Sequence, residues 1–360
     1  MTRHSYSWWA IVFGAALAGA GRGQEPAGAG VAAPPPAAAG ENTLWIGPPE
    51  GEHSKLVQLP GALAEPRLGW CVAYLWHRAG KDWEPGGLHA ELEKYDSNDP
   101  ETQRWNIQLW KECGMDFAAG CWFGVPQRRG AVLPTRTTEA FESYLRTCEQ
   151  EKFRWCAWMA DIPGGLEPNL EQVRKWAKSP AYFRWGKPER PVLFIYERTL
   201  DKLGRRENAR AALDKLRPYK DEFFLVLVGV PAAGIPKQER GLGLSWYGLP
   251  WMEPKYLAEQ YRIVAERPDL DLFALLFHSF DNRATRAGQN AGTLWPEGGP
   301  SLPFAVGQLE LAVTSLPNAL GVPWDELGER SAWCPTRELG RQYYDLLKAT
   351  LQNFKAAGSK

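Results

Sequence analysis

Short apolar segments alternate with helix-like segments along most of the chain, and this alternation constrains the fold more than any other feature. Seven apolar runs are nearly continuous in hydrophobicity and are bounded by glycine, proline or charge, at residues 68–76, 115–123, 153–159, 191–196, 223–230, 242–247 and 270–277. An eighth, less regular run lies within residues 309–322. Such runs are typical of strands that are buried on both faces of a parallel sheet.

The segments between the apolar runs have the composition of helices, at 99–113, 138–151, 170–178, 207–216 and 254–266. Pro254 is well placed to begin the last of these, because the first helical turn tolerates its missing N–H. A final segment, 339–354, places its apolar residues on one helical stripe. Strands that alternate with helices predict a parallel sheet, and eight such units predict a closed (β/α)8 barrel of the TIM type. The alternative is an open, doubly wound α/β sheet.

The N-terminal part of the chain is expected to lie outside the folded domain. Residues 1–23 combine a basic start, an apolar stretch and a small-residue exit, a pattern typical of a secretory signal peptide. The apolar stretch is too short for a transmembrane helix. Residues 24–43 are rich in alanine, proline and glycine, as disordered spacers are. We therefore expect an exported protein with one folded domain over 44–360 and no membrane span after cleavage.

Charge and tryptophan content bear on the partners of the chain. Its 42 basic and 42 acidic side chains give a formal net charge of zero. This balance does not indicate a nucleic-acid partner, because nucleic-acid-binding surfaces are usually strongly basic. The 18 tryptophans offer flat apolar surfaces that each keep one polar N–H. Most are expected in the core of a monomer, while a minority in a cleft would suit the apolar faces of sugar rings.

The six cysteines show no spacing that indicates a metal site. Cys71, Cys121 and Cys156 lie inside apolar runs, which predicts buried thiols. Cys113 and Cys148 each precede such a run. In an exported protein these two residues are either free thiols or a disulfide, and the sequence leaves both alternatives open. The chain also has no glycine-rich phosphate loop and no Gly-x-Ser-x-Gly motif, so we expect neither a cofactor nor esterase chemistry.

Candidate site residues follow the apolar runs, because barrel enzymes place their chemistry at the C-terminal ends of the strands. Aromatic, imidazole, amide and carboxyl side chains gather at these positions and suit a cleft that binds carbohydrate: Trp76, His77, Trp122, Asp161, Tyr196, Glu197, Trp246, Tyr247, Asp281 and Asn282. Each of these residue types also has a purely structural interpretation. The histidines, including His278, can be packed core residues, the acids can form structural ion pairs, and Asx residues often cap the following segment.

Two glutamates, Glu326 and Glu329, stand three residues apart after the last apolar run. On a helical turn, this spacing puts two side chains on one face with about 5–6 Å between their Cβ atoms. Retaining glycosidases separate their two carboxyl groups by roughly the same distance. Neighbouring carboxylates also tend to share one proton, which provides one acid and one base. The alternative is a solvated turn, given the charged neighbours Asp325 and Arg330.

Four motifs together resemble glycoside hydrolase family 99 and its relatives, which include endo-α-mannosidases and endo-α-mannanases. The strand at 69–77 is similar to the family's Gly-x-Tyr-Tyr opening with a following tryptophan. Residues 95–100 are similar to its Tyr-x-Ser-x-Asp-Pro segment, and the strand entry at 113–124 is similar to its Ala-Gly-Ile-Asp-Phe entry, which ends in Trp-Trp-Gly. Phe280-Asp281-Asn282, followed by Arg286, resembles the Trp-Asp-Asn-x-x-Arg segment of related sequences. The fourth motif begins at Trp324 and aligns without a gap to Trp-Asn-Glu-Trp-x-Glu, followed by Pro335, Gly340 and Tyr343.

The resemblance spans nearly the whole folded chain and implies a retaining hydrolase of a polysaccharide or glycan, with α-mannosides among the candidates. In the family, the first glutamate of the motif deprotonates the sugar 2-hydroxyl, which forms an anhydrosugar, and the second acts as general acid and then base. The resemblance assigns these roles to Glu326 and Glu329. The chain departs from the motif at Asp325, Leu327, Arg330 and Cys334. A barrel that binds carbohydrate without cutting it is therefore the alternative.

Overall fold

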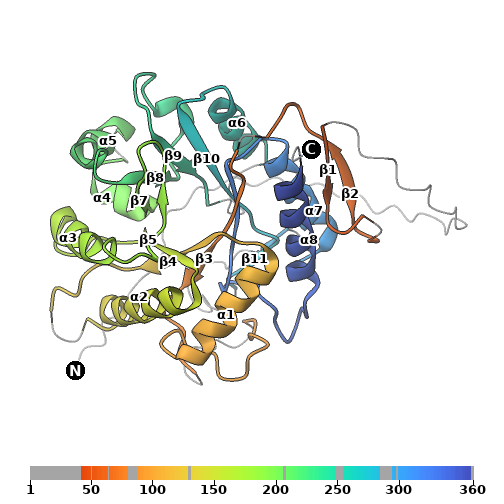
Figure 1. The fold of residues 1–360 in the computed structure, drawn as a ribbon, viewed down its shortest axis with the longest axis horizontal. Coiled ribbons are helices and arrows are strands. Elements are labelled where there is room, and N and C mark those ends of the chain that lie inside the picture. Colours follow the sequence, from red (N-terminus) through yellow and green to blue (C-terminus); the bar gives the residue numbers. More distant parts are fainter. Residues whose placement is uncertain are drawn as a thin grey trace, which may run out of the picture. The chain divides into compact units, whose positions relative to one another are not determined.

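The described part of the chain forms a closed barrel of eight parallel strands surrounded by helices (Figure 1). The computed structural model describes residues 42–49, 51–63, 65–79, 87–128, 131–205, 208–247, 254–283, 294–296 and 299–357. All of them lie in one unit of the chain, Ala38–Lys360. The expected signal peptide lies outside the described residues, as does the expected spacer apart from Asn42 and Thr43.

The barrel strands follow one another around the barrel in sequence order. They are β3 (Leu68–Tyr74), β4 (Phe117–Trp122), β5 (Arg154–Met159), β7 (Arg190–Ile195), β8 (Phe224–Val228), β9 (Leu242–Ser245), β10 (Leu270–Leu275) and β13 (Ala319–Pro323). Pairing of β13 with β3 and of β5 with β7 closes the sheet on itself. The predicted (β/α)8 barrel is therefore confirmed, and the open-sheet alternative is wrong.

The helices occupy the segments between the strands. They are α1 (Pro100–Cys113), α2 (Val132–Glu151), α3 (Leu166–Trp176), α4 (Glu197–Lys202), α5 (Ala209–Leu216), α6 (Pro254–Ala265), α7 (Leu302–Val313) and α8 (Gln342–Ala356). Helix α1 shows how local sequence sets their bounds. The Asp99 side chain accepts a hydrogen bond from the Thr102 amide at 3.0 Å, and Gly114 ends the helix with φ 87°.

Short strands lie beside the barrel, and the eighth apolar run divides between two elements. The additional strands are β1 (Thr43–Ile46), β2 (Lys55–Gln58), β6 (Arg184–Trp185), β11 (Phe280–Asp281) and β12 (Leu294–Trp295). Residues 309–313 of the predicted run end α7, and only 319–323 form a strand. Helix α7 is rich in apolar residues, so a continuous apolar stretch there did not distinguish helix from strand.

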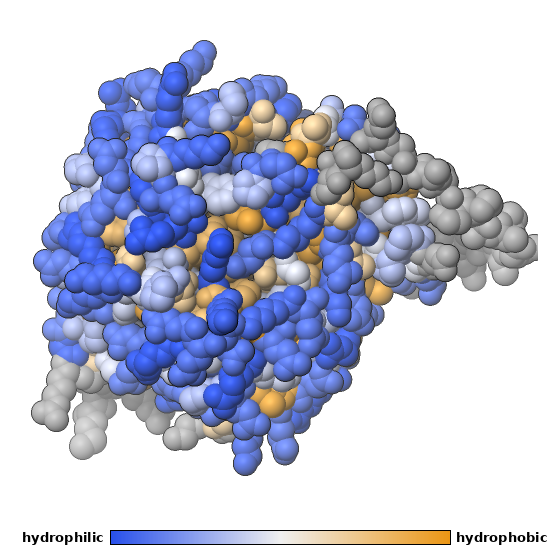
Figure 2. Space-filling model, viewed as in Figure 1, coloured by the Kyte–Doolittle hydropathy of each residue, from blue (hydrophilic) through white to orange (hydrophobic). Residues whose placement is uncertain are grey.

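The surface contrasts with this apolar interior. The face in Figure 2 is mainly hydrophilic, with hydrophobic residues in small areas between hydrophilic ones. Among the described residues, Val132 and Tyr256 are the large hydrophobic side chains that are exposed. The apolar content of the sequence is thus used mostly inside the barrel and between the strands and helices.

The interior of the barrel is filled by aromatic rings around Trp70 of β3. Its ring centroid lies 4.7 Å from that of Phe194, 5.8 Å from Phe117 and 6.2 Å from Trp158. The indole N–H donates to the backbone oxygen of Ala274 at 3.2 Å. A Cβ atom on Gly321 of β13 would lie 2.2 Å from the Trp70 Nε1 atom, so only glycine fits at this position.

We expect Gly321→Ala to destabilise the fold by roughly 1–3 kcal/mol, because overpacking forces the Trp70 ring or the strand to move. Gly307→Ala is the matched control, since Gly307 lies within α7 and a Cβ atom there would meet nothing within 4 Å. The control should gain about 0.5–1 kcal/mol from the better helix propensity of alanine. Denaturant unfolding of both variants measures the difference, and equal stabilities would contradict this account of the barrel interior.

Candidate active site

The glutamate pair lies in the turn that follows β13, at the C-terminal end of the barrel. The segment is not helical, so the predicted helical turn is wrong. The Trp324 amide donates to the backbone oxygen of Val72 at 2.8 Å, and the Ser331 amide donates to the backbone oxygen of Glu326 at 3.2 Å. These bonds keep the backbone paired with β3 and then reverse it, and the intervening residues form turns, as in the bond from the Arg330 amide to the backbone oxygen of Leu327 at 3.3 Å, rather than an α-helix. Both glutamates are nevertheless held beside the strand ends.

The Glu326 side chain is buried and lies within electrostatic reach of Glu329. Its exposed fraction is 7%, whereas Glu329 is half-buried. Burial raises the pKa of the Glu326 carboxyl well above its ordinary value, and the charges of Glu329 and Asp325 raise it further. A hydrogen bond with the Tyr74 side chain opposes this increase in pKa. The two carboxyl groups are therefore coupled, because ionisation of one disfavours ionisation of the other.

Three tyrosines surround the pair at the C-terminal ends of separate strands. Tyr74 ends β3, Tyr196 follows β7 and Tyr247 follows β9. The hydroxyl groups of Tyr74 and Tyr247 are hydrogen-bonded, and the rings of Tyr196 and Tyr247 lie 5.8 Å apart. Burial raises the pKa of all three, and nearby Glu326 contributes to each increase. Tyr196 and Tyr247 were predicted site residues, whereas the sequence interpretation missed Tyr74, which ends the Gly69 to Tyr74 part of the first family motif.

Trp76 and His77 lie next to this cluster but differ in their surroundings. Trp76 is half-buried, with its ring 4.8 Å from Tyr74 and 5.7 Å from Phe123. His77 is buried, and its Nε2 atom is 2.8 Å from the backbone oxygen of Asp325. Trp76 is thus placed among the aromatic groups at the barrel end. His77 instead connects the segment after β3 with the turn that carries the glutamates.

The structure contradicts the prediction that Trp122 and Trp246 line the cleft. Both are fully buried. Trp122 donates to Thr138 of α2 at 2.9 Å, and the Trp246 ring lies 5.8 Å from that of Tyr261 in α6. Each side chain therefore points out of the barrel toward a helix. The two tryptophans belong to the core between the strands and the helices.

Asp161 and Glu197 lie at strand ends but are engaged in ion pairs with α4 and the segment after it. Asp161 pairs with Lys202 and, at 3.1 Å, with Arg198. Glu197 begins α4 and lies 3.6 Å from Arg205. These contacts match the structural alternative for both acids.

Asp281 and Asn282 lie in and after β11 and are connected to the glutamate turn. The Asp281 amide donates to the backbone oxygen of Glu329 at 2.7 Å. Its carboxylate accepts three hydrogen bonds from Arg283, two from the guanidinium and one from the backbone amide, which lower the pKa of Asp281. Asn282 is buried. Asp281 thus holds the turn through its backbone, and Arg286 lies outside the described residues.

His278 is a packed core residue, as the structural alternative predicted. Its ring stacks on Tyr343 at 3.9 Å, and its Nε2 atom is 2.8 Å from the backbone oxygen of Ala332. Burial lowers the pKa of His278 to about 4, so the ring is neutral at physiological pH. It therefore supplies no charge to the strand-end cluster.

The described residues provide no alternative chemistry at a metal or a disulfide. Within these ranges, no group of three or more His, Cys, Asp or Glu side chains is placed to hold a metal ion. All six cysteines are buried free thiols, so the Cys113–Cys148 disulfide is not formed. No helix in the described ranges has the length and apolar character needed to cross a bilayer.

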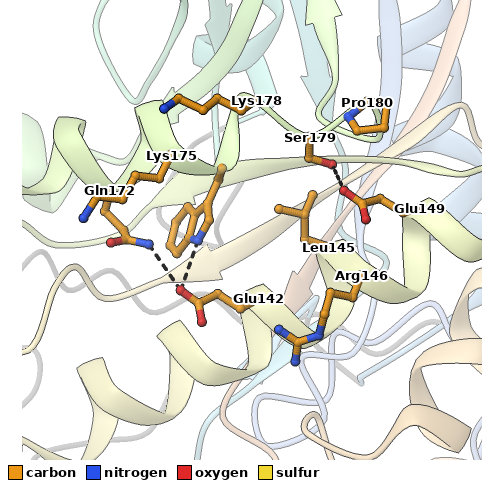
Figure 3. A pocket seen from close by; sticks show the side chains of 10 residues that line it. Glu142, Leu145, Arg146, Glu149, Gln172, Lys175, Lys178, Ser179 and Pro180 are labelled. Atoms are coloured by element: carbon orange, nitrogen blue, oxygen red, sulfur yellow. Dashed lines mark hydrogen bonds between the residues drawn. The ribbon is translucent and has the colours of Figure 1, made fainter.

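A hollow of about 470 Å³ lies on the outside of the barrel between α2 and the end of α3 (Figure 3). Its acidic groups already have partners. Glu142 accepts from Gln172 at 3.2 Å and from Trp176 at 3.3 Å, and Glu149 accepts from Ser179 at 2.5 Å. Helix α2 ends just before β5 begins, so this end of α2 lies toward the N-terminal ends of the strands. The hollow is therefore not part of the glutamate site.

The fold and the strand-end cluster define a (β/α)8 barrel with a carboxyl pair after its last strand. Comparisons with family models and with curated proteins give no match. Among solved structures, the GH99 endo-α-mannosidase from Bacteroides thetaiotaomicron has a similar fold, with a TM-score of 0.59 and 15% identity over 81% of this chain and 98% of that chain. Its complex with bis-tris-propane gives 0.61 and 14% over the same shares.

A glycoside hydrolase-like protein has a similar fold as well, with a TM-score of 0.56 and 9% identity over 81% of this chain and 96% of that chain. These similarities confirm, at the level of the fold, the resemblance to glycoside hydrolase family 99 that the sequence motifs indicated. The same barrel architecture thus extends over nearly the whole length of the compared proteins.

We expect Trp122→Ala to cost about 3–5 kcal/mol of stability, because the fully buried ring leaves a cavity between β4 and the helices. Trp76→Ala is the matched control, since it removes the same side chain from a half-buried position at the same end of the barrel. The control should cost less stability and weaken glycan binding more. Urea unfolding measures the stability of both variants, and binding titrations measure their glycan affinity. If Trp122→Ala weakened glycan binding more than Trp76→Ala and cost less stability, Trp122 would belong to the site.

Proposed function

We propose that the chain is a glycoside hydrolase that cleaves a glycan with the carboxyl pair Glu326 and Glu329. The observation that carries this proposal is the buried Glu326 carboxyl, whose pKa is raised by burial and by the charge of Glu329, at the C-terminal end of the barrel. Barrel enzymes place their chemistry at this end. The fold similarity to an endo-α-mannosidase supports carbohydrate as the substrate.

In the proposed reaction, Glu326 is the base and Glu329 the acid. Ionised Glu326 takes the proton of the sugar 2-hydroxyl, whose oxygen attacks the anomeric carbon while the bond to the leaving oxygen breaks. Glu329 protonates that leaving oxygen. Water, deprotonated by Glu329, then opens the anhydrosugar at the anomeric carbon, and Glu326 returns its proton to the 2-oxygen. Two displacements give net retention of configuration.

The surroundings of Glu326 suit this base role. A carboxylate with a raised pKa is a stronger base, and proton transfer is most effective when the pKa of the catalytic group lies near the working pH. The tyrosines Tyr74, Tyr196 and Tyr247 offer flat faces and hydroxyl groups to a sugar, and half-buried Trp76 lies beside them. An α-mannoside-containing glycan is the substrate class that the motif and the fold similarity support.

We also propose that the protein is exported, with residues 1–23 as the signal and 24–43 as the spacer. The basic start, the apolar stretch and the small-residue exit support this proposal. Export would bring the barrel to extracellular or periplasmic polysaccharides and glycans.

Glu326→Gln and Glu329→Gln should each lower kcat by about 10²–10⁴-fold, because glutamine keeps the shape of the side chain but transfers no proton. An activated aryl leaving group needs little protonation, so it should rescue the first step of Glu329→Gln but not of Glu326→Gln. The double variant should lose far less than the product of the single losses, since the two groups act as a unit.

Glu310→Gln on α7 is the matched control for these variants, because Glu310 pairs with Lys55 away from the glutamate turn. It should keep full turnover. Rescue of Glu326→Gln instead of Glu329→Gln would exchange the two roles. Wild-type protein that binds oligosaccharides but cleaves none in a broad panel, α-mannosides included, would instead support the carbohydrate-binding barrel.

The pH dependence of kcat/KM should show the raised pKa of Glu326. A base must be ionised to act, so activity should be lost as the pH falls through the pKa of Glu326, well above the ordinary glutamate value of 4.5. Initial rates across the pH range with a glycan substrate measure this acid limb. A limb at or below the ordinary glutamate value would contradict the assignment of Glu326 as the base.

A further inference from the structure

Asp325 is a buried acid that has no role in the reaction proposed above. Its exposed fraction is 1%. One carboxyl oxygen accepts from the Tyr74 amide at 2.7 Å, and the other accepts from the Tyr95 hydroxyl at 2.6 Å. The Nε2 atom of His77 lies 3.8 Å from the second oxygen. A carboxyl group buried so completely needs such partners, because desolvation of a charge is costly.

The directions of the hydrogen bonds around Asp325 can be traced from its neighbours. The indole N–H of Trp324 can only donate, and it lies 2.6 Å from the Asn106 Oδ1 atom, so that oxygen is the acceptor. The Asn106 amide nitrogen therefore donates to the Tyr95 oxygen at 2.8 Å. The Tyr95 proton is thus directed to Asp325. Both oxygens of Asp325 thus accept hydrogen bonds, and such bonds favour the ionised form of the carboxyl group.

Tyr74 connects this carboxylate to the glutamate pair. Its backbone amide binds Asp325, and its side chain is hydrogen-bonded with Glu326 and Tyr247. The β3–β13 ladder ends at the pairing of Pro323 with Val72, just before this point. The Asp325 bond therefore extends the connection between the two strands beyond the ladder and fixes Tyr74 relative to Glu326.

We propose that Asp325 is a positioning residue for Glu326: it ties the end of β3 to the glutamate turn and holds a buried negative charge beside the Glu326 carboxyl. This inference rests on the proposed function for its role in catalysis. The position of the Asp325 carboxyl group in the glutamate turn rests on the hydrogen-bond geometry alone. Asp325 touches no reacting atom in the proposed reaction and acts through Glu326.

The buried charge strengthens Glu326 as a base. After burial and the charge of Glu329, Asp325 is the next cause of the raised pKa of Glu326. Burial raises the pKa of Asp325 as well, while His77, Tyr95 and the Tyr74 amide lower it. The titratable groups from the surrounding elements that face one carboxyl or the other are Cys71, Tyr74, His77, Tyr95, Cys121, Tyr144, Tyr196, Tyr247, Glu329 and Cys334.

Asp325→Asn tests the role of the charge, because asparagine keeps the shape and can still accept from the Tyr74 amide. The pKa of Glu326 should fall, so the acid limb of kcat/KM should move to lower pH. The plateau of kcat should also fall, since the base is weaker. A residue with a purely structural role would change stability and leave the position of the acid limb unchanged, which would overturn the proposal.

Asp116→Asn is the matched control, because Asp116 anchors the opposite end of β3. It accepts from the Gly69 amide at 2.8 Å and pairs with Lys355 at 2.8 Å. Its loss should lower stability without moving the acid limb. A shift equal to that of Asp325→Asn would show that loosening of β3, rather than loss of the nearby charge, changes Glu326, and would overturn the proposal.

A carbon-13 NMR titration of the glutamate carboxyl groups measures the pKa of Glu326 directly and does not require enzymatic activity. The Glu326 resonance is assigned from its loss in Glu326→Gln and followed in wild type and in Asp325→Asn. A lower midpoint in Asp325→Asn supports the proposal even if no glycan is cleaved, in which case the proposed function alone fails. Equal midpoints overturn the proposal even if the protein is an active hydrolase.

If Asp325→Asn does not fold, the proposal is tested by an NMR titration of the wild-type protein. The Asp325 carboxyl resonance, labelled at the aspartate side chains, should report an ionised group throughout the pH range in which Glu326 titrates. An Asp325 that keeps a proton over that range has no charge to place beside Glu326, and this result overturns the proposal.

Discussion

Alternation of side chains along the barrel strands decides which residues can reach the site. Successive residues of a strand point to opposite faces, so each barrel strand sends every second side chain inward. In β3 this parity points Trp70 into the aromatic interior and Tyr74 toward the glutamate pair. At the end of β4 and after β9, it turns Trp122 and Trp246 outward to the helices. The core and the site thus follow from one geometrical rule.

The glutamate turn depends on buried polar groups as well as on the barrel. Asp325, Tyr95, Asn106 and Trp324 form a chain of hydrogen bonds whose directions are fixed from the indole N–H onward. Such a network is costly when it is incomplete, because each buried polar group then lacks its partner. Its completeness around Asp325 explains how the chain keeps an acid in the core next to Glu326. It also links the rigidity of the turn to the electrostatics of the site.

The sequence predicted the barrel and most of its strands, because strands buried on both faces leave continuous apolar runs. The same continuous runs did not indicate which positions of a strand face the barrel interior, because a run that is apolar on both faces does not show which tryptophan points inward. The helical turn expected at the glutamates is absent because backbone pairing with Val72 takes its place. The role of Asp325 was not predictable, because its partners Tyr95 and Tyr74 lie 230 and 251 residues away in the chain.

In the proposed function, a glycan binds with its scissile linkage at the Glu326–Glu329 pair. The most direct test is a crystal structure of Glu326→Gln with a bound mannose-containing oligosaccharide. The account predicts a sugar 2-hydroxyl at the side chain of residue 326, the glycosidic oxygen at Glu329, and a ring against Tyr74 and Tyr247. An oligosaccharide bound elsewhere, for example in the hollow between α2 and α3, with the glutamate turn empty, would contradict it.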